Sequence, residues 1–156
     1  MRYDRPMTAT SYVHLISGAP PPQLSLPPFK AIIVAEDAAN DGWRDDVSGW
    51  LVRSNCLYLC AWGNACEAWH DSMDNANIGE FEDGTIPDDR FIMTTWHEKE
   101  PLSETFWFAG ICAEHPTVEL GHTLIVHIAP CERSDALLGT VSICQYGMKR
   151  PTGANE

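Results

Sequence analysis

From residue 29 to residue 146, short apolar runs alternate with longer amphipathic stretches, and the alternation repeats four times. The apolar runs are continuous, which is typical of strands that are buried on both faces. The stretches between them place apolar residues at helical spacing, as Trp43, Val47 and Leu51 do. The expected strands are 29–35, 56–62, 91–96 and 122–129, and the expected helices are 41–54, 65–77, 101–114 and 135–146.

Four strand–helix pairs in this order predict an α/β fold, with a mostly parallel four-stranded sheet and helices on both faces. This three-layer arrangement is Rossmann-like or flavodoxin-like, with right-handed crossovers. We expect the strand order 2-1-3-4, counted from the strand at 29–35, and an extra N-terminal edge strand at 12–16.

The chain has 156 residues, a length that favours a single domain, which we place at 29–146. The preceding segment, 1–28, is rich in proline between residues 20 and 28 and is expected to be extended or disordered. The residues after the last helix, 147–156, are expected to form a flexible tail.

The formal net charge is −12, and the ten lysine and arginine residues form no cluster. A protein that binds nucleic acid needs such residues to replace phosphate counterions, so no nucleic-acid binding is expected. An anionic membrane surface would repel the chain as well, and no stretch approaches the ~20 apolar residues of a membrane helix. The charge favours either simple solubility or a basic protein partner. A small-molecule partner and a homodimer stay open.

The sequence contains six cysteines, and Cys60 and Cys112 lie within apolar runs. In such runs cysteine behaves as a small buried hydrophobic residue. The N-terminus lacks the basic region and apolar run of a signal peptide. Together these features predict free thiols in a reducing, cytoplasmic environment.

Polar residues follow each expected strand, at the edge of a parallel sheet where ligands bind. The segment 94–98 is the richest of these, because it holds His97 and Glu98 just before a helix N-terminus. His97 is a candidate general base, oriented by Asp37 or Glu36, since histidine titrates near neutral pH. The alternative is a histidine whose nitrogens are bonded at the strand end for structural reasons.

A second hypothesis makes Cys66 or Cys131 a nucleophile that is paired with His97. Cys66 lies close to a helix start, where a thiol pKa is lowered. The alternative is a buried, inert thiol. The predicted catalytic residues are therefore His97, Glu98, Asp37 and Cys66, and the predicted ligand-binding residues are Trp62, Asn64, Thr95 and Trp96.

Metal and nucleotide sites find little support in the sequence. A metal ion would need ligands such as Asp37, His97, Glu98 and Cys131, but neither Cys-x-x-Cys nor His-Glu-x-x-His occurs. The first strand is followed by no Gly-x-Gly-x-x-Gly and no Walker lysine. We therefore predict no metal and no cofactor.

Five of the six tryptophans lie between Trp43 and Trp96, and most are expected to supply core area. The others are available to stack on a ligand or a partner. Between residues 67 and 89 the chain is densely acidic. This region is either a solvated surface or a docking surface for a basic protein, anchored by Trp69. His127, between apolar neighbours, is expected to be a core histidine.

Five runs resemble the motifs of an uncharacterised bacterial domain family, and together they span about residues 29–130. They are CLYLCAWG at 56–63, WHDSMDNAN at 69–77, FIMTTWHE at 91–98, ETFWFA at 104–109 and HPTVEL at 115–120. The resemblance implies a bacterial, intracellular origin. It implies no activity and assigns no catalytic role to any residue.

These observations favour an uncharacterised or non-catalytic α/β module that binds a protein partner or a small ligand. The alternative is a small hydrolase or transferase, with a site around His97 at the carboxyl ends of the strands. The distinguishing feature is geometric. An enzyme would bring five residues together in one hollow, namely Asp37, Trp62, Cys66, His97 and Glu98. The sequence leaves open whether the protein is an enzyme.

Overall fold

Strand β2 (Phe29–Ala35) lies at the centre of a five-stranded, all-parallel sheet in the computed structural model, which describes residues 9–146. The other elements are β1 (Ala9–Leu15), α1 (Asp41–Arg53), β3 (Cys56–Gly63), α2 (Cys66–Gly79), a 3-10 turn η1 (Asp88–Arg90), β4 (Met93–His97), α3 (Leu102–Ile111), β5 (His122–Ile128) and α4 (Ser134–Tyr146). The α/β class and the N-terminal edge strand are confirmed.

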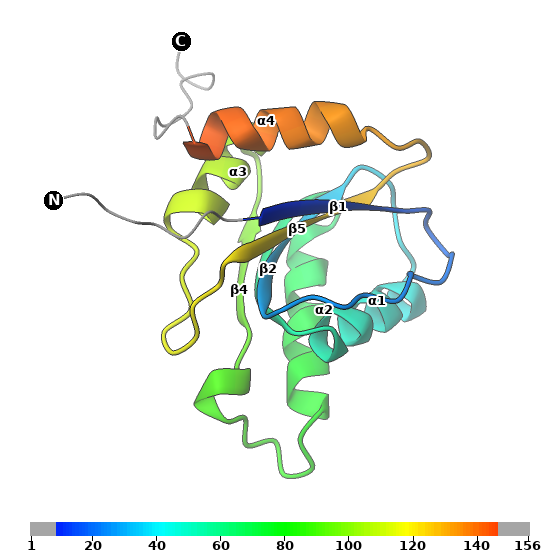
Figure 1. Ribbon diagram of the computed structural model, residues 1–156. Coiled ribbons are helices and arrows are strands. Elements are labelled where there is room, and N and C mark those ends of the chain that lie inside the picture. The colour runs from blue at the N-terminus through cyan, green and yellow to red at the C-terminus, as the bar shows by residue number, and fades with distance from the viewer. Residues whose placement is uncertain (1–8, 147–156) are drawn as a thin grey trace, which may run out of the picture.

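Both faces of the sheet are covered by helices, α1 and α2 on one side and α3 and α4 on the other (Figure 1). The alternation of side chains along β2 requires this. Ala31 and Ile33 belong to one apolar core, and Ile32 and Val34 belong to the other. None of the helices within residues 9–146 is long and apolar enough to cross a bilayer.

The strand order is β1-β5-β2-β3-β4, so the expected order of 2-1-3-4 is wrong. Counted in the same way, the four strands follow the order 3-2-1-4. From β2 the chain steps to β3 and β4 toward one edge, and α1 and α2 cover the same face. The helix α3 then crosses the opposite face and returns the chain to β5, on the other side of β2. The topological switch point therefore lies between β2 and β5.

The N-terminal part of the described chain packs on the sheet and on α1. All seven residues of β1 pair with β5. The proline-rich segment that follows accepts two hydrogen bonds from indoles of α1: Trp43 Nε1 donates to the Ala19 carbonyl and Trp50 Nε1 to the Pro22 carbonyl, both at 2.7 Å. Residues 1–8 and the expected tail at 147–156 lie outside the described residues.

Gly63, at the end of β3, allows this strand to approach β2 closely. Its φ is 100°, in the left-handed region, and a Cβ at this position would lie 2.2 Å from the Ala35 carbonyl oxygen. The next residue uses the same oxygen, because the Asn64 N–H donates to it at 2.7 Å. The chain can make this turn only with glycine.

Substituting Gly63→Ala is therefore expected to destabilise the fold by about 2–3 kcal/mol, through backbone strain and steric overlap. Chemical denaturation measures this change. The matched control is Gly139→Ala in α4, where an added Cβ meets nothing within 4 Å. The control is expected to be neutral or to stabilise the protein by up to about 1 kcal/mol. Equal effects of the two substitutions would contradict the close approach at Gly63.

Candidate functional site

A hollow of about 470 Å³ lies beyond the carboxyl ends of β3 and β4. Trp62 reaches it from β3, Cys66 from the first turn of α2, and His97 from the end of β4, with Glu98 following. The complete lining is Trp62, Gly63, Ala65, Cys66, Glu67, His97, Glu98, Lys99 and Glu100. Four of the eight residues that the sequence suggested thus meet at one place.

The imidazole of His97 is buried and bonded at both nitrogens. Nδ1 lies 3.2 Å from Glu100 Oε2, and Nε2 lies 2.9 Å from Thr95 Oγ1. A carboxylate only accepts hydrogen bonds, so Nδ1 carries the proton and Nε2 accepts from the Thr95 hydroxyl. Thr105 of α3 also donates to Glu100 Oε2, at 3.0 Å. The carboxylate that orients His97 is therefore Glu100, a residue that the sequence analysis did not select.

Burial is the main influence on the protonation of His97. It lowers the pKa of the imidazole, and the nearby Glu100 carboxylate only partly opposes this by raising it. The ring of Phe108, in α3, packs edge-on against the imidazole with a centroid separation of 4.9 Å. This apolar contact adds to the burial and favours neutral imidazole.

Cys66 lies at the first position of α2, as expected, but its thiol is not activated. Burial raises the pKa of Cys66, and the Glu98 carboxylate raises it further. Hydrogen bonds from nearby backbone groups oppose these effects without reversing them. The thiol is therefore expected to stay protonated at neutral pH, which is the opposite of what a cysteine nucleophile needs.

The remaining suggested residues do not line the hollow. Asp37 follows β2, and its backbone N–H donates to the Ile128 carbonyl at 3.1 Å. Asn64 is bonded through its backbone to the end of β2. Thr95 positions His97, as described above. Trp96 lies on the other face of β4, where its ring packs on His70 of α2 with a centroid separation of 4.5 Å.

The backbone around the hollow contains three residues with left-handed conformations. They are Gly63, with φ of 100°, Ala65, with φ of 54°, and Lys99, with φ of 60°. For alanine and lysine this region costs about 1–2 kcal/mol each. Such strain tends to gather at binding and active sites, where the surrounding structure maintains it.

A second polar cluster lies at the switch point and is centred on His127, which is fully buried. Tyr12 Oη lies 2.6 Å from Nδ1, and Nε2 lies 2.6 Å from Glu36 Oε1. The backbone N–H of Arg133 donates to Tyr12 Oη at 3.0 Å, and its guanidinium contacts both Glu36 oxygens. In the neutral tautomer the phenol therefore donates to Nδ1, and Nε2–H donates to Glu36.

Hydrogen bonds and opposite charges stabilise this cluster. Burial alone would raise the pKa of Glu36, but hydrogen bonds from His127 and Arg133 outweigh it and lower the pKa. Burial raises the pKa of the Tyr12 phenol. Glu36, which the sequence suggested as a partner for His97, bonds to His127 instead. The four groups satisfy one another, so the cluster joins the carboxyl ends of β1, β2 and β5.

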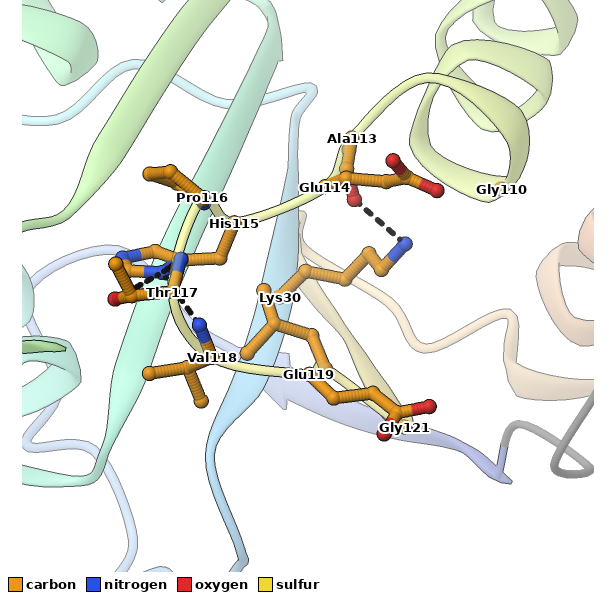
Figure 2. Close-up of a pocket in the computed structure, with 11 residues that line it drawn as sticks. Lys30, Gly110, Ala113, Glu114, His115, Pro116, Thr117, Val118, Glu119 and Gly121 are labelled. Atoms are coloured by element: carbon orange, nitrogen blue, oxygen red, sulfur yellow. Dashed lines mark hydrogen bonds between the residues drawn. The ribbon is translucent and has the colours of Figure 1, made fainter.

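Another hollow of about 470 Å³ lies at the opposite, amino-terminal end of the sheet. Figure 2 shows Lys30 reaching across it toward Ala113, after the end of α3. The Lys30 ammonium donates to the carbonyls of Ala109 and Ala113, at 2.7 and 3.0 Å. This side chain therefore caps the C-terminal end of α3, which carries partial negative charge.

The loop beside that hollow is fixed by His115. Its Nδ1 accepts hydrogen bonds from the backbone N–H groups of Thr117 and Val118, at 3.2 and 3.1 Å. Nε2–H then donates to the Phe91 carbonyl at 2.7 Å. Lys30 and His115 thus have structural partners at this end of the sheet, and ligands of parallel sheets bind at the other end.

The structure does not bring the candidate metal ligands together as one group; they are Asp37, His97, Glu98 and Cys131. Within residues 9–146, no group of three or more histidine, cysteine, aspartate or glutamate side chains is arranged to hold a metal ion. Asp37 and Cys131 do not line the hollow that contains His97 and Glu98.

Comparison with known protein families gives a match over residues 10–143, to a family described as "Domain of unknown function (DUF7684)". The match covers most of the chain and includes all of β1 except its first residue, whereas the sequence resemblance did not reach this strand. It confirms the expected membership of an uncharacterised domain family. No curated protein and no solved structure matches the chain. The comparisons therefore name no activity.

The lowered pKa of His97 predicts how stability depends on pH. An unfolded histidine takes up a proton near pH ~6.5, while buried His97 takes it up only at lower pH. Stability should therefore be fully present above about pH 6.5 and decrease as the pH falls below it. The variant His97→Gln should show a shallower decrease in chemical denaturation between about pH 7.5 and 5.5.

Burial also lowers the pKa of His122, so the wild-type slope contains a contribution of the same sign from that residue. The difference between the two proteins isolates His97. Parallel stability curves for wild type and His97→Gln would show that His97 is not held neutral by its surroundings.

Proposed function

The chain belongs to the DUF7684 family of domains of unknown function, and we propose that it is a non-catalytic module that binds a small organic cation in the hollow beyond β3 and β4. The observation that supports this proposal is the composition of the hollow, which combines three carboxylates with an indole. The carboxylates are those of Glu67, Glu98 and Glu100, and the indole is that of Trp62.

The charge of the hollow selects the class of ligand. Three glutamates and one lysine, Lys99, line it, so the carboxylates are in excess. An anion such as a phosphate would be repelled, whereas an ammonium group would be attracted. Indole faces also attract cations, and tryptophan is the strongest of the aromatic residues in this respect. A primary or quaternary ammonium compound fits both features.

The shape of the hollow supports a small ligand. Its volume of about 470 Å³ falls within the ~300–1,000 Å³ of small-molecule pockets. The Trp62 ring is held in place because Nε1 donates to the Glu100 carbonyl at 2.8 Å. The left-handed Ala65 and Lys99 fix the two turns that border the hollow. A site that is already formed avoids part of the entropic cost of binding.

Catalysis by a hydrolase or transferase mechanism is less well supported by this arrangement. A general base needs a nitrogen within hydrogen-bond reach of the substrate, and both nitrogens of His97 are bonded within the protein. A cysteine nucleophile needs a lowered pKa, and that of Cys66 is raised. We therefore place His97 in the role of shaping the hollow, whereas Glu100 orients His97 through Oε2 and also adds its charge to that of the other two glutamates.

The cellular location of the protein is also part of the proposal. All six cysteines lie within residues 9–146 and are free, and four of them are buried. Free thiols suit a reducing compartment, so we propose a cytoplasmic location in a bacterium. A redox-sensitive fluorescent fusion and cell fractionation of a bacterium that carries the gene would test this placement.

Choline and 3,3-dimethylbutanol, its uncharged analogue of the same shape, provide the sharpest test of the ligand class. Isothermal titration calorimetry should detect binding of choline and much weaker binding of the uncharged analogue. The variant Glu67→Gln/Glu98→Gln preserves volume and removes two charges. It should weaken choline binding about tenfold or more, since each nearby charge contributes about 1 kcal/mol.

The matched control is Glu119→Gln, which makes the same substitution at the amino-terminal hollow and should leave choline binding unchanged. Equal binding of choline and its uncharged analogue would contradict the proposed role of charge. Equal weakening by Glu119→Gln would place the ligand elsewhere.

A further inference from the structure

The strand β4 forms one edge of the sheet and is open along that edge. In the described part of the chain, β4 pairs with β3 and with no other strand. The opposite edge is β1. An open edge presents backbone N–H and C=O groups that can pair with an added strand.

Exposed apolar side chains surround this edge. Ile78 at the end of α2, Phe91 before β4 and Trp96 within β4 are exposed by 49%, 44% and 42%. Ile78 and Phe91 also line a hollow of about 320 Å³ between α2 and β4. We call the open edge, this hollow and the three side chains the β4 surface. Large exposed apolar groups gathered in one place mark interaction sites.

The three side chains belong to one continuous surface. Trp96 packs on the imidazole of His70, with ring centroids 4.5 Å apart. His70 Nε2 lies 3.5 Å from Asp74 Oδ2, and Asp74 lines the hollow together with Ile78 and Phe91. The series from Trp96 through His70 to Asp74 therefore runs along α2 into the hollow.

Asn77 of α2 fixes the backbone beneath this surface. It is buried, its amide donates to the Arg90 carbonyl at 3.1 Å, and its amide oxygen accepts from the Ile92 N–H at 2.9 Å. These two bonds hold the segment before β4 against α2. Phe91, between the two bonded residues, is thereby presented to solvent. The apolar groups are exposed by a specific arrangement of the backbone.

The surroundings of the β4 surface are strongly acidic. Within residues 66–97 the sequence has one basic residue, Arg90, and eight acidic ones, namely Glu67, Asp71, Asp74, Glu80, Glu82, Asp83, Asp88 and Asp89. Several of them lie in the connection between α2 and β4, which forms the green loop at the foot of the molecule in Figure 1. Apolar groups within such a region match a partner that is both apolar and basic.

A second copy of this chain is a poor occupant for the surface. Each copy has a net charge of −12, and pairing two β4 surfaces would bring the two acidic segments together. Like charges at an interface oppose association, and their effect grows when water is excluded. The charge therefore disfavours a second copy, which an open strand edge would otherwise favour.

We propose that the β4 surface binds an extended, basic peptide segment of a partner protein, which pairs with the open edge of β4 as an added strand. Its backbone bonds to β4. Its apolar side chains, at alternate positions, contact Phe91, Trp96 and the 320 Å³ hollow. Its lysine or arginine side chains face the surrounding carboxylates. This interaction is separate from the proposed binding of an organic cation in the hollow beyond β3 and β4.

The probe is a synthetic peptide of roughly eight residues, the length of a strand, that alternates lysine with valine. The full chain should bind it in a titration followed by calorimetry, and the affinity should decrease as salt is added. Amide hydrogen exchange in β4 should slow when the peptide is bound. A peptide that alternates glutamate with valine should not bind.

Two variants locate the interaction. Trp96→Ala should weaken binding of the lysine–valine peptide about tenfold, as expected for a central aromatic residue. Asp88→Asn/Asp89→Asn should weaken it less and reduce the salt dependence. The matched control is Ile143→Ala, which removes an apolar side chain that is 77% exposed on α4. This control should bind like wild type, and all three variants should unfold with a similar midpoint.

Several results would overturn the proposal. They are absence of binding at the highest soluble peptide concentration, equal binding of the acidic peptide, and unchanged affinity in Trp96→Ala. A dimer in analytical ultracentrifugation that is abolished by Trp96→Ala would show that the occupant is a second copy.

Discussion

The position of every element in this fold depends on β2, which is paired on both edges and buried on both faces. Its residues Ala31 to Val34 have no exposed surface, and the strand pairs with β5 on one side and β3 on the other. Because its alternate side chains enter two separate cores, helices must cover both faces. The ends of β2 then define the two ends of the sheet, where the Lys30 ammonium caps α3 and where Gly63 makes its tight turn over Ala35.

Most of the fold was predictable from the sequence, because strands that are buried on both faces and amphipathic helices have distinct patterns. The strand at 29–35 was predicted with the bounds that β2 has, and each helix was predicted within a few residues. The strand order was not predictable, because it depends on which face each crossover covers. That choice is made by packing between distant residues, such as the contact of Trp43 in α1 with Trp69 in α2, at 6.1 Å between ring centroids.

The candidate site was predictable in part, for a related reason. The rule that ligands bind beyond the carboxyl ends of parallel strands selected His97, Cys66 and Trp62, which do line one hollow. The partner of His97 was missed, because the residue three positions along can bond to it only if the backbone turns sharply at Lys99. The cluster around His127 was missed as well. It joins residues that lie more than 90 positions apart, and no local spacing indicates such a contact.

The hollow that we propose as the binding site lies beside the edge of the sheet, beyond β3 and β4, and not at the topological switch point. An NMR titration of the isotope-labelled full chain with choline tests this placement most directly, since every backbone amide reports separately. We expect the largest amide shifts at 62–67 and 97–100. Shifts concentrated around Glu36 and 127–133, or in the loop 115–121, would contradict it.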